Sequence, residues 1–339
     1  MVCGDVEADG LDRDAWHQWF DEDGAVMLCP FPGTRAWQFQ ATPERDPDGR
    51  PVPPSVESFQ RLFDRHARVP GVRLRNPTWL STYRVNVRMA DRLRAGRVLL
   101  AGDAAHVHSI AGGLGMNTGI QDAYNLGWKL ALVTAGRAAP ALLDTYEEER
   151  LPIAAWTLET SSERTRAVLA AIREPGGGTD TVVTPETRAL ALGYRWSSLS
   201  REYDHREGGL RAGDRAPDAP CRAAADGAPV RLFETFAGPH FTLLGFGPAS
   251  VPVLREVVEE FGELVRACPV DAGPQGLADH AGHARAAYGV TGDSLVLVRP
   301  DNHLALTAPA TDGREVLDYL RYLRRCVPGD RRARADRRA

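Results

Sequence analysis

The chain contains almost no lysine. Of its 41 basic residues only Lys129 is a lysine, so arginine carries nearly all of the positive charge. We attribute this bias to the codon usage of a GC-rich genome rather than to a function. With 45 acidic residues the formal net charge is -4, which argues against a general electrostatic attraction to nucleic acid or to anionic membranes.

Cysteine is scarce and follows no binding pattern. The chain has no CxxC pair and no histidine at metal-ligand spacing from a cysteine; its cysteines are Cys3, Cys29, Cys221, Cys268 and Cys326. A disulfide framework or a zinc site is therefore not expected. A reducing, cytoplasmic location fits best.

Long apolar runs are also absent. No segment approaches the roughly 20 apolar residues that are needed to span a bilayer. The first residues, MVCGDVEADGLDRD, are acidic and lack an apolar stretch, so a signal peptide is not expected. The arginine-rich residues 330–339 are predicted to be a disordered, solubilising tail rather than a nucleic-acid contact.

The overall composition is that of a folded protein. The chain has 339 residues, of which 43% are hydrophobic and 25% charged. These values are close to globular averages, and the length suffices for two ordinary domains.

Antiparallel strands are predicted near the N-terminus. Residues 14–42 contain two apolar runs joined by an Asp21-Glu22-Asp23-Gly24 turn, followed by an alternating segment at 36–41. Residues 55–68 predict an amphipathic helix that begins after Ser55 as its N-cap. Residues 79–88 predict a further strand, with Trp79, Ser81, Tyr83, Val85 and Val87 on one face.

The segment 96–135 is the most informative. Val98 to Ala101 is a continuous apolar run, which is typical of a buried parallel strand. It ends in Gly102-Asp103 and leads through a glycine-rich loop at 111–115 into a helical pattern from about 116 to 135. A glycine-rich loop before a helix N-terminus admits a flat ring or phosphate and favours an anion, such as a reduced flavin. A plain tight turn is the alternative.

The remaining chain predicts a second helix and a separate C-terminal unit. The helix covers about 140–172 and carries the charge run 147–150, and a glycine-rich hinge follows at 174–179. After Gly208 the pattern predicts a small α/β unit. Its elements are strands at 241–246 and 294–299, a helix at 252–266, a hairpin strand at 303–306 and a closing helix at 313–326.

Residues 96–132, GRVLLAGDAAHVHSIAGGLGMNTGIQDAYNLGWKLAL, resemble the second flavin-binding motif of class A FAD-dependent aromatic hydroxylases. This is the para-hydroxybenzoate hydroxylase superfamily, and the phenol and aromatic-polyketide hydroxylases are the most similar subgroup. The resemblance implies an α/β (α+β mix) fold class: a truncated FAD/NAD(P)-binding-type fold with an antiparallel substrate sheet and a C-terminal thioredoxin-like domain. The implied organisation is a substrate-binding region at 1–95, a partial FAD-binding region at 96–174, a linker at 175–207, the thioredoxin-like domain at 208–328 and a disordered tail at 329–339.

The resemblance also implies a cofactor site. Asp103 would bind the ribityl or pyrophosphate part of FAD, and the loop and helix start would lie along the isoalloxazine edge. The expected cofactor-binding residues are Asp103, Gly112, Gly113, Leu114, Gly115, Met116 and Asn117. Gln121 and Asp122 continue the motif, with either a packing or a ligand role. No catalytic base is identified.

Two departures from the family pattern affect these expectations. Ile110 stands where the family usually has proline beside the reactive flavin carbon, and no GxGxxG loop is found in the sequence. We therefore expect a fragment or split protein that binds FAD weakly or only with a separately encoded N-terminal FAD-domain fragment. An unpaired edge beside 98–101 would favour a homodimer or aggregation.

The leading hypothesis is an FAD-dependent monooxygenase that hydroxylates an aromatic or polyketide-type small molecule. By resemblance, NAD(P)H would reduce the flavin and a flavin C4a-hydroperoxide would deliver the oxygen atom. The competing hypothesis is a non-catalytic homologue that acts as a binding or partner protein.

Weaker alternatives concern isolated residues. Asp103, His106 and His108 form an incomplete metal set, and no metal is predicted. Cys268 with His280 or His283 lacks the pattern of a nucleophile and its base. The aromatic side chains of Trp16, Trp19, Trp37 and Phe39 are either core or the lining of an aromatic-substrate pocket.

Overall fold

The structure is a computed structural model that describes residues 1–84, 86–109, 113–171, 191–203 and 209–325. The predicted hinge at 174–179 and the predicted tail lie outside the described residues. Two compact units are present: Met1–Arg88 with Val107–Leu114 and Leu158–Val183, and Met89–His106 with Gly115–Thr157 and Thr184–Ala339. In the described part of the chain, no helix is both long and apolar enough to cross a membrane.

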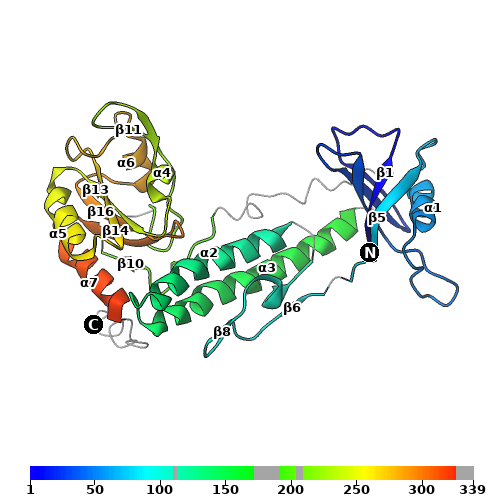
Figure 1. Cartoon of the computed structure of the whole chain (residues 1–339), viewed down its shortest axis with the longest axis horizontal. Coiled ribbons are helices and arrows are strands. Elements are labelled where there is room, and N and C mark those ends of the chain that lie inside the picture. Colours follow the sequence, from blue (N-terminus) through cyan, green and yellow to red (C-terminus); the bar gives the residue numbers. More distant parts are fainter. Residues whose placement is uncertain (85, 110–112, 172–190, 204–208, 326–339) are drawn as a thin grey trace. The chain divides into compact units, whose positions relative to one another are not determined.

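The first unit is built on an antiparallel sheet with the strand order β2-β3-β4-β1-β5, covered by one helix (Figure 1). The elements are β1 Val2–Ala8, β2 His17–Asp21, β3 Gly24–Pro30, β4 Ala36–Ala41, β5 Leu74–Thr82 and α1 Val56–His66. The predicted N-cap of α1 is confirmed, because the Ser55 side chain accepts a hydrogen bond from the Ser58 N–H.

The core of this unit lies between α1 and one face of the sheet. Trp37 and Phe39 are fully buried, and the Phe39 ring stacks on Phe59 of α1 at a centroid distance of 4.3 Å. Trp19 packs at the edge of this core, whereas Trp16 is 64% exposed. Trp37 and Phe39 are therefore core residues rather than the lining of a pocket.

One predicted strand of this unit has different bounds. The extended run was expected at 79–88, but β5 is Leu74–Thr82, and Trp79 and Tyr83 are exposed. The register is set by β1, which the sequence analysis did not predict and which pairs along β5 from Val2 opposite Thr82 to Ala8 opposite Leu74. Val85 lies outside the described residues.

The second unit contains short strands, a large sheet and the greater part of two long helices, whose residues 114 and 158–171 belong to the first unit. Its short elements begin with β6 Arg88–Met89, β7 Arg94–Ala95, β8 Val98–Leu99, the 3-10 turn η1 Gly102–Ala104 and β9 His106–Val107. The helices are α2 Leu114–Thr134 and α3 Asp144–Ala171, the latter preceded by η2 Pro140–Leu143. The helix predictions for 116–135 and 140–172 are confirmed.

The prediction of a buried parallel strand at 98–101 was wrong. Val98–Leu99 pairs antiparallel with Arg94–Ala95, and Val98 is 62% exposed. An apolar run alone does not supply the neighbouring strands that a parallel sheet needs, and the described part of the chain places only β7 beside it.

The C-terminal part of the second unit has the mixed α/β architecture that the sequence predicted. Its eight-stranded sheet has the order β10-β17-β16-β13-β14-β15-β11-β12. The strands are β10 Arg201–Glu202, β11 Pro220–Ala223, β12 Pro229–Arg231, β13 Phe241–Phe246, β14 Val265–Val270, β15 Leu277–Ala278, β16 Ser294–Val298 and β17 Leu304–Pro309. The helical segments are α4 Leu232–Phe236, η5 Pro248–Ser250, α5 Val251–Phe261, α6 His283–Tyr288 and α7 Gly313–Arg325.

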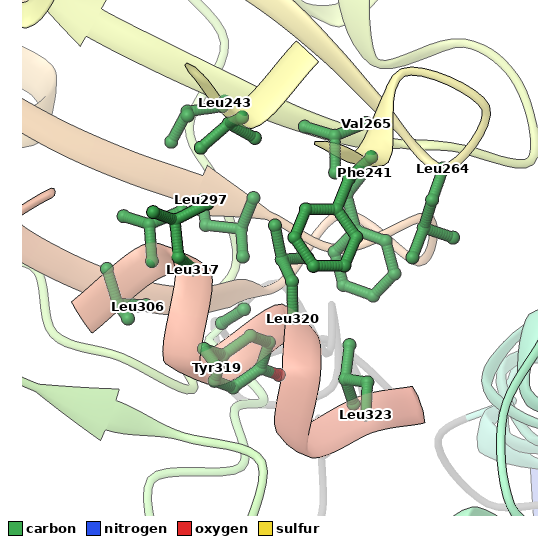
Figure 2. Packing of buried hydrophobic residues seen from close by; sticks show 14 of the residues in the cluster. Phe241, Leu243, Leu264, Val265, Leu297, Leu306, Leu317, Tyr319, Leu320 and Leu323 are labelled. Atoms are coloured by element: carbon green, nitrogen blue, oxygen red, sulfur yellow. The ribbon is translucent and has the colours of Figure 1, made fainter. Parts of the chain in front are cut away.

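The expected hairpin across residues 300–302 is confirmed by the antiparallel pairing of β16 with β17. The helix expected at 252–266 was too long, because α5 ends at Phe261 and Val265 begins β14 beside β13. On one face of the sheet, Leu317 and Leu320 of α7 pack towards Phe241 and Leu297 (Figure 2). Trp128 and Leu132 of α2 join the same core.

Candidate functional site

The predicted cofactor turn follows β8. Gly102–Ala104 forms a single 3-10 turn, closed by a hydrogen bond of 2.8 Å from the Ala105 N–H to the Gly102 carbonyl. Gly102 has φ +57, a conformation that other residues rarely adopt. Asp103 is exposed at this turn, so its carboxylate is accessible to a polar ligand.

Helix α2 holds the turn by two contacts. A Cβ on Gly119 would lie only 3.2 Å from the Gly102 Cα, so the two backbones approach as closely as glycine allows. The Gly102 N–H donates to Asp122 Oδ2 at 3.0 Å. The conformation of the turn therefore depends on two residues that lie within the helix.

The other predicted site residues lie at the start of α2. Leu114 is its first residue, Gly115, Met116 and Asn117 follow in its first turn, and the Met116 side chain is 76% exposed. Gly113 has φ +62, and a Cβ built on it would meet no atom within 4 Å. Gly112 and Ile110 lie outside the described residues. The exposed carboxylate of Asp103 can accept hydrogen bonds from hydroxyl groups, and the positive end of a long helix can bind an anionic group; each of these properties fits a part of FAD.

Asp122 has a structural role. Its side chain is fully buried, and Oδ2 accepts hydrogen bonds from Gly102 N and from His106 Nε2, the latter at 2.6 Å. Oδ1 accepts from Arg150 Nε at 2.7 Å. Burial alone would raise the pKa of Asp122, but the bond from His106 and the charge of Arg150 outweigh it and lower the pKa. Of the two roles considered for Asp122, the structure therefore shows the packing role and not the ligand role.

Arg150 extends these contacts towards the C-terminal part of the unit. Its guanidinium is fully buried and donates to Asp122, to the hydroxyl of Tyr194 at 3.0 Å and to the carbonyl of Thr118 at 3.2 Å. Gln121 instead lines a crevice of about 90 Å³ together with Tyr194 and His303.

A second buried cluster of charged side chains is centred on Glu149, the residue before Arg150 on α3. The Glu149 carboxylate accepts from Lys129 Nζ at 2.6 Å and from Arg299 at 2.6 and 2.9 Å. Arg299 also donates to Asp301, at 2.9 Å from Nε and 2.6 Å from its terminal nitrogen. Burial opposes the charged form of both carboxyl groups, but the cations hold the pKa of Glu149 and of Asp301 well below the usual range. Burial lowers the pKa of Lys129 to about 8.

Sequence reasoning missed this polar network. Arg150 and Glu149 were placed in a charge run, Arg299 at the end of a strand, and Asp301 in a hairpin turn. A detectable signal was Asp122, Asn125 and Lys129 at helical spacing on the otherwise apolar side of α2, where a buried polar residue needs a partner from elsewhere.

Metal and thiol chemistry receive no support from the part of the chain that the structure covers. Within the described ranges, no group of three or more His, Cys, Asp or Glu side chains is arranged to hold a metal ion. His106 is bound to Asp122. The Cys268 thiol is buried, which raises its pKa to about 12 and makes it a poor nucleophile.

The first unit offers a second, partly open sheet face. Strand alternation places Cys3, Asp5, Met27, Gln38 and Gln40 opposite the core face, and each is partly buried or half-exposed. Gln40 Nε2 donates to Gln38 Oε1 at 2.8 Å. This face combines apolar and polar groups and suits a flat ligand with hydroxyl groups.

The chain is similar to known flavin-dependent proteins. Residues 6–161 match the protein family described as FAD binding domain. The chain is 42% identical over 325 residues to a flavin-dependent monooxygenase of Mycobacteroides abscessus, a match that covers 94% of this chain and 59% of the relative. It is 35% identical over 321 residues to pentachlorophenol 4-monooxygenase of Sphingobium chlorophenolicum, covering 86% of this chain and 56% of that protein.

Among solved structures, the chain is similar to aklavinone-11 hydroxylase in a ternary complex with FAD and aklavinone. The TM-score is 0.76 at 26% identity, and the match covers 95% of this chain and 62% of that chain. The match thus spans between half and two thirds of the length of each of these three proteins.

Proposed function

The chain is a relative of the FAD-dependent aromatic monooxygenases, as residues 96–132 predicted, and on that premise we propose that it takes part in FAD-dependent hydroxylation of an aromatic or polyketide-type small molecule. The observation that carries the proposal is the exposed Asp103 on a glycine turn fastened to a long helix. A non-catalytic role is not favoured, because these relatives are named as monooxygenases or hydroxylases.

The proposed cofactor contacts come from the turn and the helix start. Asp103 accepts hydrogen bonds from hydroxyl groups of the ribityl chain or binds near the pyrophosphate. Gly113, Leu114, Gly115, Met116 and Asn117 offer backbone groups and the positive helix end to the flavin edge. When bound, FAD supplies electron transfer from NAD(P)H and the activation of O₂. The protein's own residues bind, orient and exclude water.

The substrate region is proposed to be residues 1–95. The partly open sheet face carries Gln38 and Gln40 as hydrogen-bonding groups and Met27 and Cys3 as apolar ones. A ring can lie across such a face while its hydroxyl groups pair with the amides. The regions 96–174 and 208–328 are proposed to be the partial FAD-binding and thioredoxin-like parts.

A further polypeptide region is proposed to complete the activity. The exposed side chains of Met116, Ile120 and Tyr124 recur every four residues on α2 and form an apolar stripe. The relatives are longer than this chain, and no GxGxxG loop for the ADP half is found in its sequence. We therefore expect weak FAD binding by the chain alone and tighter binding with the remaining portion of a relative, or self-association through the stripe.

The first test is flavin affinity. Asp103→Ala should weaken FAD binding about ten- to hundredfold, since one charge-assisted hydrogen bond is worth roughly 1.5–3 kcal/mol. Asp318→Ala, at an exposed position of α7, is the matched control and should leave the affinity unchanged. Fluorescence titration measures both, and equal affinities in all three proteins would remove Asp103 from the site.

The second test is turnover. The chain is assayed with FAD, NADH or NADPH and a phenol or tetracyclic polyketide, alone and with the remaining portion of the Mycobacteroides relative as a separate polypeptide. The expected product gains one oxygen atom in mass spectrometry, with substrate-dependent oxidation of the nicotinamide. No product with the added portion present would contradict the proposed activity.

A further inference from the structure

The turn that carries Asp103 is held from a distance by a chain of hydrogen bonds that begins at the partly buried Gly102 and continues through buried side chains. The Gly102 N–H binds Asp122, Asp122 binds Arg150, and Arg150 binds the hydroxyl of Tyr194. We propose that Arg150 and Tyr194 are positioning residues for the cofactor turn, so that docking of the segment 194–198 on α3 sets the affinity for FAD. This inference rests on the proposed function.

The side chains of Asp122, Arg150 and Tyr194 in this path are buried, so few other groups can replace their hydrogen bonds. The donors of Arg150 are divided among Asp122, the Tyr194 hydroxyl and the Thr118 carbonyl, and water does not reach the fully buried guanidinium. A buried charge that loses one of its partners shifts towards those that remain. A shift of Arg150 would move the Asp122 carboxylate, which holds the Gly102 N–H and His106 Nε2 on its other oxygen.

Tyr194 is anchored independently of Arg150. Its backbone N–H donates to the Gly213 carbonyl at 2.7 Å, and its ring lies 4.4 Å from the ring of His303. The carbonyl of Tyr194 accepts from the Ser197 N–H at 2.9 Å and from the Ser200 hydroxyl at 2.7 Å. The hydroxyl of Tyr194 is thus a fixed point in the C-terminal part of the unit, against which Arg150 is placed.

One turn of α3, residues 148–150, makes several hydrogen bonds with the segment 194–198. Glu148 accepts from the Ser198 N–H at 2.8 Å and from its hydroxyl at 2.6 Å, and its carbonyl accepts from Trp196 Nε1. Glu149 accepts from the Ser197 hydroxyl at 2.6 Å. Among these three neighbouring residues, Arg150 is the one that continues to Asp122 and the turn. The contacts of Glu148 end at the segment and provide an internal control.

The experiment compares Tyr194→Phe with Ser198→Ala. Both variants remove one hydroxyl from the same segment, but only Tyr194→Phe breaks the path to Asp122. The first readout needs no cofactor: the amide signal of Gly102 and the imidazole nitrogen signals of His106, recorded by NMR on selectively labelled apoprotein. The second readout is the dissociation constant for FAD, measured with the remaining portion of the relative present if the chain alone binds too weakly.

Tyr194→Phe is expected to shift the Gly102 and His106 signals and to weaken FAD binding about 2- to 30-fold, the range typical of coupling through packed networks. Ser198→Ala should change neither. In an Arg150→Lys background, which already interrupts the path, Tyr194→Phe should have little additional effect on FAD affinity. That non-additivity would not follow from a general loss of stability.

Three outcomes would count against the inference. Unchanged Gly102 and His106 signals in Tyr194→Phe would overturn the proposed path. Shifted signals with unchanged FAD affinity, or an equal loss of affinity in Ser198→Ala, would overturn its role in positioning the turn. If the wild-type protein binds no FAD under any condition, the proposed function fails and with it the link to FAD, while the NMR signals still decide whether the path exists.

Discussion

Replacement of Glu149 by glutamine should strongly destabilise the second unit. The carboxylate accepts five hydrogen bonds, from Asn125, Lys129, Ser197 and twice from Arg299. Both of its oxygens receive a cationic donor, so a glutamine amide would point its NH₂ group at a buried cation in either orientation. The change also gives the buried set of Lys129, Arg299, Glu149 and Asp301 a net positive charge.

The size of the effect follows from the burial of the partners. Removing one member of a buried ion pair leaves an uncompensated charge and typically costs about 3–5 kcal/mol. For a unit of this size that corresponds to a fall in melting temperature of roughly 6–20 °C. Glu148→Gln is the matched control, because the half-buried Glu148 carboxylate accepts from the N–H and hydroxyl of Ser198 and from no cation among the described residues, and it should cost about 1 kcal/mol.

Urea and thermal unfolding followed by circular dichroism measure these losses. The double variant Lys129→Met with Glu149→Gln restores charge balance and should be more stable than Glu149→Gln alone. The reasoning would be refuted if Glu148→Gln and Glu149→Gln cost the same, or if the two changes in the double variant simply added.

Other changes test the turn, the carboxylates and the thiols. Gly119→Ala should lower the free energy of unfolding by about 1–3 kcal/mol and weaken FAD binding, because the new Cβ would lie too close to the Gly102 backbone. Gly127→Ala is the control: its Cβ would meet open space, so the variant should be neutral or more stable by up to about 1 kcal/mol. Urea unfolding midpoints compare the two variants. The lowered pKa values of Asp122, Glu149 and Asp301 mean that the unfolded chain takes up protons first as the pH falls. The free energy of unfolding should thus keep its full value above about pH 4.5 and decrease as the pH falls below it. The decrease should be less steep in Asp122→Asn, and urea titrations at several pH values measure both proteins. Burial raises the pKa of Cys221 to about 11 and of Cys268 to about 12. At pH 8 both thiols should therefore be alkylated more slowly than those of the less buried Cys3 and Cys29. Mass spectrometry of the alkylated native protein measures the four rates, and equal rates would contradict the prediction.

Local patterns predicted most of the elements and the position of the candidate site. The N-cap at Ser55, the helix after the glycine-rich loop and the hairpin at 300–302 each depend on residues close in sequence, and each was confirmed. The first strand was missed although Val2, Val6 and Ala8 alternate with polar residues, because the acidic N-terminus was considered only as a possible leader.

Features that depend on distant residues could not be predicted in the same way. The exposure of Val98 reflects which strands lie beside it, and a run of apolar letters does not contain that information. Asp122, Arg150 and Tyr194 form one path across 28 and 44 positions of sequence. Such pairings are set by tertiary packing, so the predicted site lacked the residues that hold it.

The burial of Lys129 has a practical consequence for chemical labelling. This residue is the only lysine of the chain, and its ammonium group is fully enclosed and paired with Glu149. Acylating reagents therefore do not reach the Lys129 ammonium group while the second unit is folded. The appearance of an acyl group on Lys129 therefore reports that the interior between α2 and α3 has opened.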